Sequence, residues 1–246
     1  MEKVSIIMPS YNSAATIVRS IKSVQQQDYL FWELLITDDA STDNTVELVK
    51  CLASEDPRIN IEINQVNSGA AVSRNQSINR STGKYIAFLD ADDLWLPNKL
   101  STQVAYMEQT GAVFTYTGYQ KFSAECMGGE IIPPLRITYD QLLYGCVIGC
   151  LTVMFNAEKL GRQNMPLIRK RQDMGLWLML LKLCDAAHGL PEVLAHYRTD
   201  SGMSQNKLNA ARYQWRLYRD VVGLNFFKST WYFCWYAVNG FIKYRK

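Results

Sequence analysis

The sequence offers few side chains for a metal–thiolate site or a disulfide framework. Its 246 residues include two histidines and six cysteines, and the cysteines are scattered without a Cys-x-x-Cys pair. Structural zinc sites are built from closely spaced pairs of Cys and His ligands, so the sequence does not predict one. Scattered cysteines also argue against a disulfide framework and favour a reducing, cytoplasmic location.

The sequence also predicts neither a targeting segment nor a membrane-spanning helix. Residues 1–5 show no basic stretch leading into a long apolar run, so they do not predict a signal peptide. The C-terminal uncharged run, residues 229–242, is shorter than the roughly 20 apolar residues that a transmembrane helix requires. We therefore expect this run to lie on a bilayer or pack on the protein, not to span a membrane.

Positive charge is concentrated near the C-terminus. The formal net charge is +3, but residues 207–246 hold eight basic side chains against one acid, so this tail is +7 and residues 1–206 are −4. The tail is also aromatic, and this composition suits a helix on an anionic membrane surface. The alternative is a helix packed on the domain with its arginines in solvent. The acidic remainder argues against a nucleic-acid partner.

The first 110 residues alternate between short apolar runs and helical patterns. Strands are expected at residues 4–8, 32–37, 59–63 and 85–89. Helices are expected between these runs and again up to about residue 109. Because β-α-β crossovers are right-handed, the alternation predicts an α/β fold with a doubly wound, mainly parallel open sheet. Ligands of such sheets bind beyond the carboxyl ends of the strands.

The pattern after residue 110 is less regular. Short strands are expected at residues 112–117, 151–155 and 193–197, and a buried helix at 175–183. Gly-Gly and Pro-Pro pairs between residues 120 and 150 predict a mobile loop region, and residues 200–206 predict a polar loop. We interpret 1–110 and 111–206 as two halves of a single domain, followed by a basic aromatic helical tail, 207–246.

An acidic cluster follows the apolar run at residues 85–89. Asp90, Asp92 and Asp93 repel one another at the end of a buried strand unless something neutralises them. Asp90 and Asp92 share one face if the chain is extended. Carboxylates bind Mg²⁺ or Mn²⁺, and Mg²⁺ usually keeps substrate phosphates among its ligands. Helix capping by Asp93 is the structural alternative, but it accounts for one acid of the three.

Two further polar clusters lie near expected strand ends. Asp38 and Asp39 follow the second strand, where a carboxylate can accept an N–H from a base such as uracil. Asn67, Gly69 and Arg74 lie around the start of the third helix, where glycine permits close backbone approach and the helix N-terminus favours an anion. Arg74 is suited either to a phosphate or to a neighbouring aspartate.

Four segments occur in an order that resembles one enzyme family. They are Pro-Ser-Tyr-Asn at residues 9–12, Asp-Asp-Ala-Ser-Thr-Asp at 38–43, the stretch 67–75, and Asp-Ala-Asp-Asp at 90–93. In this order they are similar to the family 2 inverting glycosyltransferases of GT-A fold, bacterial O-antigen or capsule type, over roughly residues 1–220. Residues 171–177 resemble the segment that carries the family's catalytic base.

The resemblance implies a role for each matching residue. It makes Asp173 the catalytic base, although Gln172 stands where the family often has Glu. The nucleotide-sugar-binding residues would be Pro9, Tyr11, Asn12, Asp38, Asp39, Asn67, Gly69, Arg74, Asp90 and Ala91. Asp92 and Asp90 would hold Mn²⁺ or Mg²⁺, with His196 as a further candidate ligand. Tyr197, Arg198 and the loop through Ser204 resemble a cover over the donor.

The same resemblance implies a reaction. The half before residue 110 would bind a UDP-sugar, and the half over 111–206, with a mixed sheet, would bind the acceptor. One hexose-type sugar would pass with inversion to a hydroxyl of a saccharide on undecaprenyl diphosphate, giving a β-linkage. The enzyme would be cytoplasmic and peripheral on the inner face of the cell membrane.

Other functions suit the residues less well. A dehydrogenase needs a Gly-x-Gly-x-x-Gly turn after the first strand, and a nucleotidyltransferase needs a glycine-rich basic loop there; residues 9–13 form neither. Processive relatives carry Gln-x-x-Arg-Trp, and residues 214–216 do not match that spacing. The alternative that stays open is a non-catalytic sugar- or membrane-binding relative of the fold.

Overall fold

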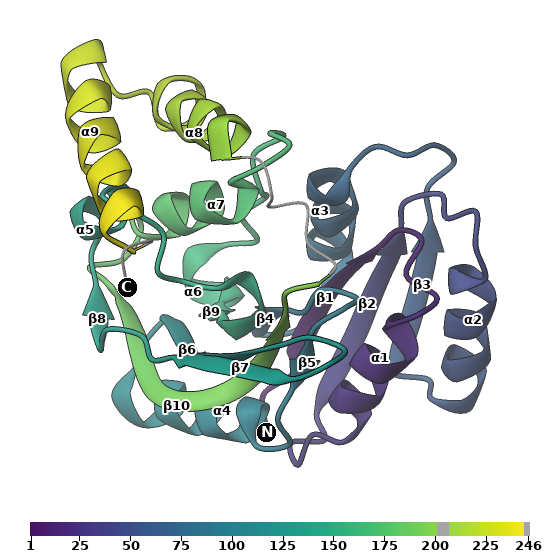
Figure 1. Ribbon diagram of the computed structural model, residues 1–246. Coiled ribbons are helices and arrows are strands. Elements are labelled where there is room, and N and C mark those ends of the chain that lie inside the picture. The colour runs from purple at the N-terminus through teal and green to yellow at the C-terminus, as the bar shows by residue number, and fades with distance from the viewer. Residues whose placement is uncertain (201–206, 244–246) are drawn as a thin grey trace.

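The N-terminal half of the protein alternates between strands and helices (Figure 1). The computed structural model describes residues 1–200 and 207–243. The strands of this half are β1 (Val4–Ser10), β2 (Trp32–Asp38), β3 (Ile59–Ile63) and β4 (Tyr85–Phe88). The helices between them are α1 (Ile17–Gln25), α2 (Thr45–Glu55) and α3 (Ala70–Arg80). Every predicted strand of this half is therefore confirmed.

One open sheet runs through the domain, parallel in its first half and mixed in its second. The strand order is β3-β2-β1-β4-β9-β6-β10-β5, and the first four strands are parallel to their neighbours. Strand β9 is antiparallel to β4 and β6, whereas β10 is parallel to β6 and antiparallel to β5. The strands of the second half are β5 (Leu94–Trp95), β6 (Phe114–Phe122), β9 (Met154–Asn156) and β10 (Ala187–Arg198). The doubly wound, mainly parallel sheet with a mixed second half is confirmed.

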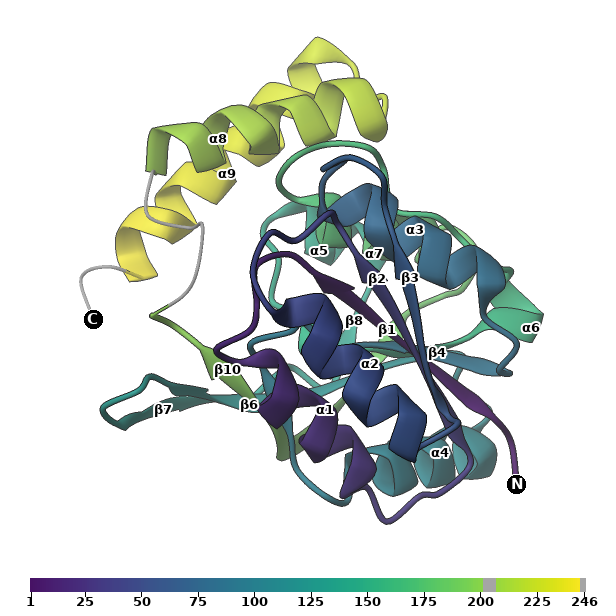
Figure 2. The same cartoon turned by 90° about the vertical axis from the view of Figure 1, so that its right-hand side faces the viewer.

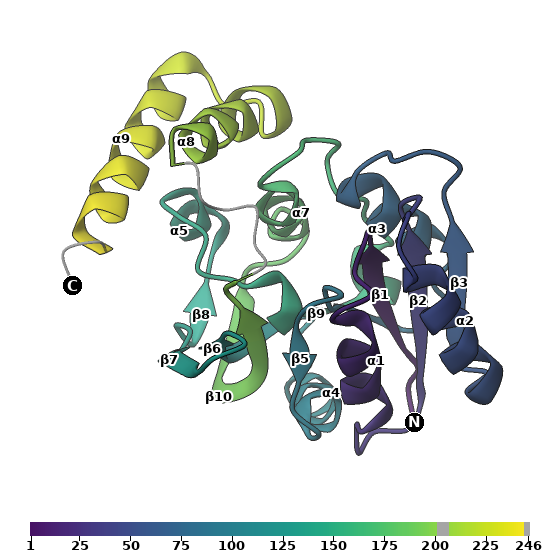
Figure 3. The same ribbon diagram turned by 45° about the vertical axis from the view of Figure 1, so that its right-hand side comes forward.

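Helices cover both faces of this sheet. Ile6 and Met8 of β1 belong to one core cluster with α1, α2 and α4 (Lys99–Thr110), whereas Ile7 belongs to a second with α3 and α7 (Gln172–Leu180). Figure 3 shows α1 and α2 at one face of β1 and β2, with α3 at the other. Strands buried on both faces are apolar at successive positions, which explains the continuous apolar runs of the sequence.

Residues 120–150 contain more regular structure than their glycine and proline pairs predict. Strand β6 continues to Phe122, β7 (Met127–Ile131) pairs back on it, and β8 (Arg136–Ile137) and α5 (Tyr139–Leu143) follow. The prediction of a loop region is thus wrong for these segments, because the Gly-Gly pair lies within β7. A turn of 3₁₀ helix (Cys150–Thr152) then leads into β9, which is followed by the short helix α6 (Ala157–Leu160).

Strand β10 is longer than the strand predicted at residues 193–197. Register shifts between Leu190 and Val193 and between Val193 and His196 let it stay paired with β6, although Pro191 lies within it. Of the predicted polar loop at residues 200–206, positions 201–206 lie outside the described residues. The sheet continues across residue 110, because β9 lies between β4 and β6. Domain boundaries at residues 110 and 206 stay predictions.

The tail forms helices that pack on the second half of the domain. Helix α8 (Lys207–Arg216) continues into a π-helical turn (Leu217–Val221), and α9 (Phe226–Lys243) lies beside α8 (Figure 2). Tyr232 and Phe233 of α9 pack against the core that contains α7, which confirms an amphipathic helical tail. No helix in residues 1–200 or 207–243 combines the length and the apolar character needed to cross a membrane.

Candidate active site

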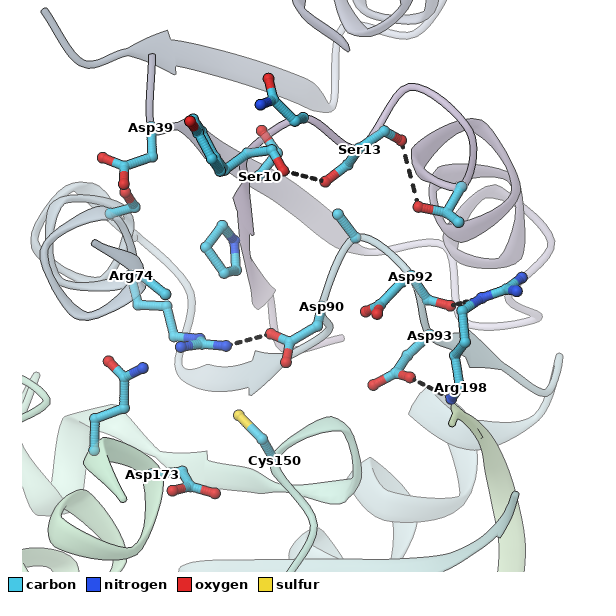
Figure 4. A pocket seen from close by; sticks show the side chains of 18 of the residues that line it. Ser10, Ser13, Asp39, Arg74, Asp90, Asp92, Asp93, Cys150, Asp173 and Arg198 are labelled. Atoms are coloured by element: carbon cyan, nitrogen blue, oxygen red, sulfur yellow. Dashed lines mark hydrogen bonds and ion pairs between the residues drawn. The ribbon is translucent and has the colours of Figure 1, made fainter. Parts of the chain in front are cut away.

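A cavity of about 650 Å³ lies at the carboxyl ends of β1, β2 and β4. Nine of the predicted site residues line it: Pro9, Tyr11, Asn12, Asp39, Arg74, Asp90, Ala91, Asp92 and Asp173. Figure 4 shows Asp39 and Asp173 on opposite sides of the ion pair between Arg74 and Asp90. Since Asp173 comes from α7 and the other eight from the N-terminal half, the cavity lies between the two halves.

Asp39 is held in one wall of the cavity by the N-terminus of α3. Its side chain is almost fully buried. Oδ1 accepts hydrogen bonds from the Ser68 N–H (2.9 Å) and from Asn64 Nδ2 (2.8 Å), and Oδ2 accepts one from the Gly69 N–H (2.7 Å). A carboxylate oxygen can accept two hydrogen bonds, so among the described contacts Oδ2 keeps room for another donor. Asp39 is therefore a fixed acceptor for a ligand N–H.

Three predicted binding residues support Asp39 and do not line the cavity. Asp38 is fully buried, and its Oδ2 accepts a hydrogen bond from Ser10 Oγ (2.8 Å), which ties the ends of β1 and β2 together. Asn67 donates to the Asp39 carbonyl oxygen (3.3 Å). Gly69 has a φ of +91°, a conformation that favours glycine, and its N–H reaches Asp39. Direct contact of these three with a nucleotide sugar stays a prediction.

Arg74 and Asp90 form an ion pair inside the cavity. Arg74 Nη2 lies 2.5 Å from Asp90 Oδ1, and Arg74 is 7% exposed. Burial by itself lowers the pKa of the Arg74 guanidinium, but the carboxylates of Asp90 and Asp173 raise it above its ordinary value. Arg74 thus stays cationic and braces an aspartate, one of the two roles that its position in the sequence allows.

The acids that follow β4 divide into two groups. Asp93 is 2% exposed, and its Oδ1 accepts the Arg198 N–H at 2.8 Å, so it joins the ends of β4 and β10. Burial, with the nearby carboxylates of Asp90 and Asp92, raises the pKa of Asp93 well above its ordinary value. Asp90 and Asp92 are partly exposed and line the cavity. The cluster therefore offers two carboxylates, not three, to a ligand.

Those two carboxylates suit a hard divalent cation that also binds a substrate. Within the described residues, no group of three or more His, Cys, Asp or Glu side chains is arranged to hold a metal. Mg²⁺ is usually held by one or two carboxylates together with substrate phosphates and water. Asp90 and Asp92 match that donor set.

His196 does not join these acids. It lies within β10, where the backbone is paired with both β5 and β6. Its half-buried ring packs against Phe122, with 6.1 Å between ring centroids, and burial lowers its pKa. Because His196 does not line the cavity that holds Asp90 and Asp92, the geometry gives no support to it as a metal ligand.

Asp173 enters the cavity from the first turn of α7. Helix α7 begins at Gln172, and its N-cap, Arg171, has a φ of +67° and makes no side-chain cap. A carboxylate in the first turn interacts favourably with the helix dipole. The next five residues of α7 are buried, so the helix is fixed against the core while Asp173 stays partly exposed at the cavity.

The end of β10 closes the cavity beside Asp92. Tyr197 and Arg198 line it, as expected of the predicted cover. The Arg198 guanidinium donates to the Asp92 carbonyl oxygen (3.2 Å) and to Asp200 (3.2 Å). The rest of the predicted cover, through Ser204, falls outside the described part of the chain.

Several cavity residues escaped the sequence analysis. Three successive basic residues before α7 line one wall: Arg169, Lys170 and Arg171. Cys150 lines it too, and burial raises the pKa of its thiol well above the usual range. The basic run is visible beside Asp173 in the sequence, but its access to the cavity depends on how α7 packs. Nothing in the sequence singles out Cys150.

The chain matches known glycosyltransferases. The sequence model of the family described as Glycosyl transferase family 2 matches residues 5–150. Identity is 42% to TuaG of Bacillus subtilis (strain 168), a glycosyltransferase named for teichuronic acid biosynthesis, over 96% of this chain and 95% of TuaG. Identity is 40% to WfgD of Escherichia coli, a UDP-Glc:alpha-D-GlcNAc-diphosphoundecaprenol beta-1,3-glucosyltransferase, over 89% of this chain and 86% of WfgD.

Two solved structures share the fold. TarS 1-349 of S. aureus in complex with UDP-GlcNAc superposes with a TM-score of 0.74 at 16% identity, covering 96% of this chain and 72% of that one. The mannosyltransferase PcManGT of Pyrobaculum calidifontis, in complex with GDP-Man and Mn²⁺, gives 0.70 at 18% identity, covering 91% and 65%. They confirm the GT-A fold. The match to the family's sequence model and the identity to TuaG and WfgD show that the chain belongs to glycosyl transferase family 2.

Proposed function

We propose that the protein transfers one hexose-type sugar from a UDP-sugar to a hydroxyl of a saccharide on a lipid diphosphate, with inversion to a β-linkage. The observation that carries the proposal is the single cavity that gathers Asp39, Asp92 and Asp173. A fixed acceptor for a base N–H, a carboxylate suited to a metal and a candidate general base are the groups that such a transfer needs.

In this proposal the donor lies along the N-terminal wall of the cavity. Asp39 accepts the ring N–H of uracil, and Tyr11 and Asn12 border the same region. Asp92 and Asp90 would hold Mn²⁺ or Mg²⁺, which when bound neutralises charge developing on the departing diphosphate. Arg74 keeps Asp90 in place through their ion pair and adds a fixed positive charge to this wall.

Asp173 serves as the general base. Its carboxylate takes the proton of the acceptor hydroxyl while that oxygen forms a bond to the anomeric carbon of the sugar. The bond between that carbon and the UDP oxygen breaks on the opposite face, so an α-linked donor gives a β-glycoside. A single displacement needs no covalent enzyme intermediate and therefore no activated nucleophile.

The relatives and helix α9 support a lipid-linked acceptor. The name of WfgD specifies GlcNAc on diphosphoundecaprenol as its acceptor. In our protein, Phe227, Trp231 and Trp235 are spaced four residues apart on α9 and are exposed. Aromatic side chains at helical spacing, in a basic segment, suit the surface of an anionic membrane. We therefore propose that the enzyme acts at the inner face of the cell membrane, held there by the exposed aromatic side chains of α9.

A donor panel tests the proposal directly. Purified protein would be assayed with UDP-, GDP- and CDP-sugars against short-chain lipid diphosphates of GlcNAc and GalNAc. We expect transfer from a UDP-hexose, loss of transfer in EDTA and recovery with Mn²⁺. Asp92→Ala should abolish transfer, whereas Asp185→Ala, at an exposed acid outside the cavity, should not. No transfer from any UDP-sugar, or full activity of metal-free protein, would contradict the proposal.

A further inference from the structure

The wall of the cavity next to Asp173 carries positive charge that the donor site does not use. Arg169, Lys170 and Arg171 all line it, and they directly precede α7. The other two arginines of the cavity are already engaged by acids: Arg74 with Asp90, and Arg198 with Asp200. In the described part of the chain, Arg169 and Arg171 form no ion pair.

Arg171 is oriented by a neutral partner on α9. Its Nη2 donates a hydrogen bond to the Tyr236 hydroxyl (2.8 Å), and its guanidinium lies 5.4 Å from the centroid of that ring. A phenol holds the guanidinium in place without neutralising its charge. Arg171 therefore links the cavity wall to the helix that carries the exposed Phe227, Trp231 and Trp235.

The short separation between Arg171 and Asp173 along the chain limits which part of the acceptor the arginine side chains can contact. Two Cα–Cα steps separate Arg171 from Asp173, so their Cα atoms lie within about 7 Å of each other. If Asp173 contacts a hydroxyl of the acceptor sugar, the group at the other end of that sugar lies within reach of the arginine side chains. In a lipid-linked acceptor this group is a diphosphate, whose oxygens match the planar donors of a guanidinium.

We infer that Arg169 and Arg171 bind the diphosphate of the lipid-linked acceptor, and not the diphosphate of the donor. The inference rests on the proposed function and adds to it a subsite for the acceptor. Tyr236 is a positioning residue here, since it orients Arg171. In this arrangement the lipid chain extends from the subsite toward α9, so one acceptor molecule contacts the subsite with its diphosphate and α9 with its lipid.

Two acceptors that differ only in the diphosphate test the subsite. One is GlcNAc-α-diphosphate on a short alkyl chain, and the other is the matching neutral alkyl glycoside of GlcNAc. The variants are Arg169→Gln, Arg171→Asn, which tolerates the positive φ, and Tyr236→Phe. Lys50→Gln, an exposed residue of α2 on the far side from α9 (Figure 1), removes one charge as the control. Melting temperatures confirm that each variant is folded.

We expect each arginine variant to lower the preference for the diphosphate acceptor, measured as the ratio of kcat/KM values, by about tenfold to a hundredfold. Tyr236→Phe should lower it less, and Lys50→Gln should leave it unchanged. KM for the UDP-sugar should stay within about twofold. Equal losses with both acceptors, no preference in the wild-type protein, or a rise in the donor KM alone would overturn the inference. Wild-type protein that glycosylates neither acceptor would overturn the proposed acceptor class, and the subsite with it.

Discussion

Asp173 illustrates how a single carboxylate can have a structural and a chemical role. It lies in the first turn of α7, where an acid stabilises a helix by roughly 0.3–1 kcal/mol through the helix dipole. It also lines the cavity, where it can take a proton from a substrate. Replacing Asp173 by the uncharged asparagine separates the two roles, because loss of the structural role lowers stability and loss of the chemical role lowers turnover.

We predict that Asp173→Asn abolishes transfer while leaving the fold intact. An amide cannot accept the hydroxyl proton, so kcat should fall by about 10²–10⁴, whereas the melting temperature should change little. Binding of the UDP-sugar, measured by calorimetry, should be retained. Asp185→Asn, at an exposed acid outside the cavity, is the matched control. If the Asp173→Asn variant bound donor and still turned over at the wild-type rate, the base would be another residue.

Asp39 should determine the choice of base. Its Oδ2 has room for the N–H of a ring nitrogen, which uracil presents at N3, whereas N3 of cytosine carries no hydrogen and is an acceptor. Two acceptors facing each other in a buried site cost roughly 1–3 kcal/mol, so UDP should bind about tenfold to a hundredfold more tightly than CDP. UDP methylated at the ring N–H should lose the same advantage. Equal affinity for all three nucleotides, measured by calorimetry, would exclude this role.

At the scale of the element, α9 has two faces with different tasks. Its inner face packs Tyr232 and Phe233 against the core, and Tyr236 contacts Arg171. Deleting residues 226–246 would therefore disturb the domain as well as any membrane contact. Substitutions of the exposed aromatic side chains disturb the core less than this deletion would, although Trp231 and Trp235 also contact Tyr144, so the melting temperature of such a variant has to be measured as well.

We predict that changing Phe227, Trp231 and Trp235 together to Ser weakens binding to anionic vesicles by more than tenfold. Each aromatic side chain loses apolar burial in the interface, typically about 1.5–3 kcal/mol for a full burial. Binding of the wild-type protein, measured by vesicle sedimentation, should also fall as salt rises. Ser at the exposed Ile132 and Leu135, which lie between β7 and β8, provides the control. Unchanged sedimentation of the triple variant would rule out α9 as the anchor.

Helix α4 contains a lysine that should make stability depend on pH. Lys99 is fully buried; its Nζ donates to Gln103 Oε1 (2.6 Å) and lies 4.0 Å from the centroid of the Trp95 ring. Burial lowers the pKa of Lys99 well below its ordinary value. The unfolded chain then binds a proton that the folded chain lacks, so the unfolding free energy rises with pH between the folded and unfolded pKa.

Lys99→Met should remove this dependence. As pH rises toward about 10, the unfolding free energy of the wild type should rise relative to that of the variant, by at most about 1.4 kcal/mol per pH unit. Urea denaturation at a series of pH values measures it, with Lys50→Met as the exposed control. Parallel pH profiles for wild type and Lys99→Met would show that Lys99 keeps its proton in the fold.

At the scale of the whole molecule, the cavity lies where the two halves of one sheet meet. The Arg198 N–H donates to Asp93 across this junction, and Asp173 reaches it from the other side. A ligand that contacts both halves binds the folded chain and not the unfolded one. Ligand binding should therefore raise the melting temperature of the entire domain.

We predict that UDP raises the melting temperature more with Mn²⁺ than without it. Ligand at 100 times its Kd stabilises a protein by about 2.7 kcal/mol, or roughly 5–10 °C for a domain of this size. In Asp92→Ala the part of the shift that depends on Mn²⁺ should vanish, while UDP alone still stabilises. Thermal unfolding in EDTA and in Mn²⁺ measures both parts. Identical shifts in the two buffers would argue against a metal bound together with UDP.

Much of the fold was predictable because its information is local. The strands β1, β2 and β4 are almost entirely buried, so each is a mainly apolar run closed by polar residues, whereas the edge strand β3 shows an alternation of apolar and polar residues. Residues 120–150 were not predictable in this way. Strand β7 is mostly exposed and contains Gly128 and Gly129, so neither hydrophobic pattern nor β propensity marks it. Pairing with β6 decides its structure.

The site, too, was predictable where its information is local and unpredictable where it depends on contacts between distant segments. By itself, the sequence determined which acids stand at the strand ends, because a strand and its polar end are neighbours in the chain. Only the tertiary structure decided that Asp39 lines the cavity while Asp38 is buried, and that His196 does not line it. It also decided that Asp173 and the basic run before it face Asp90 across one space. These relations depend on how α7 and β10 pack against β4, and packing between distant segments leaves no mark in the local pattern.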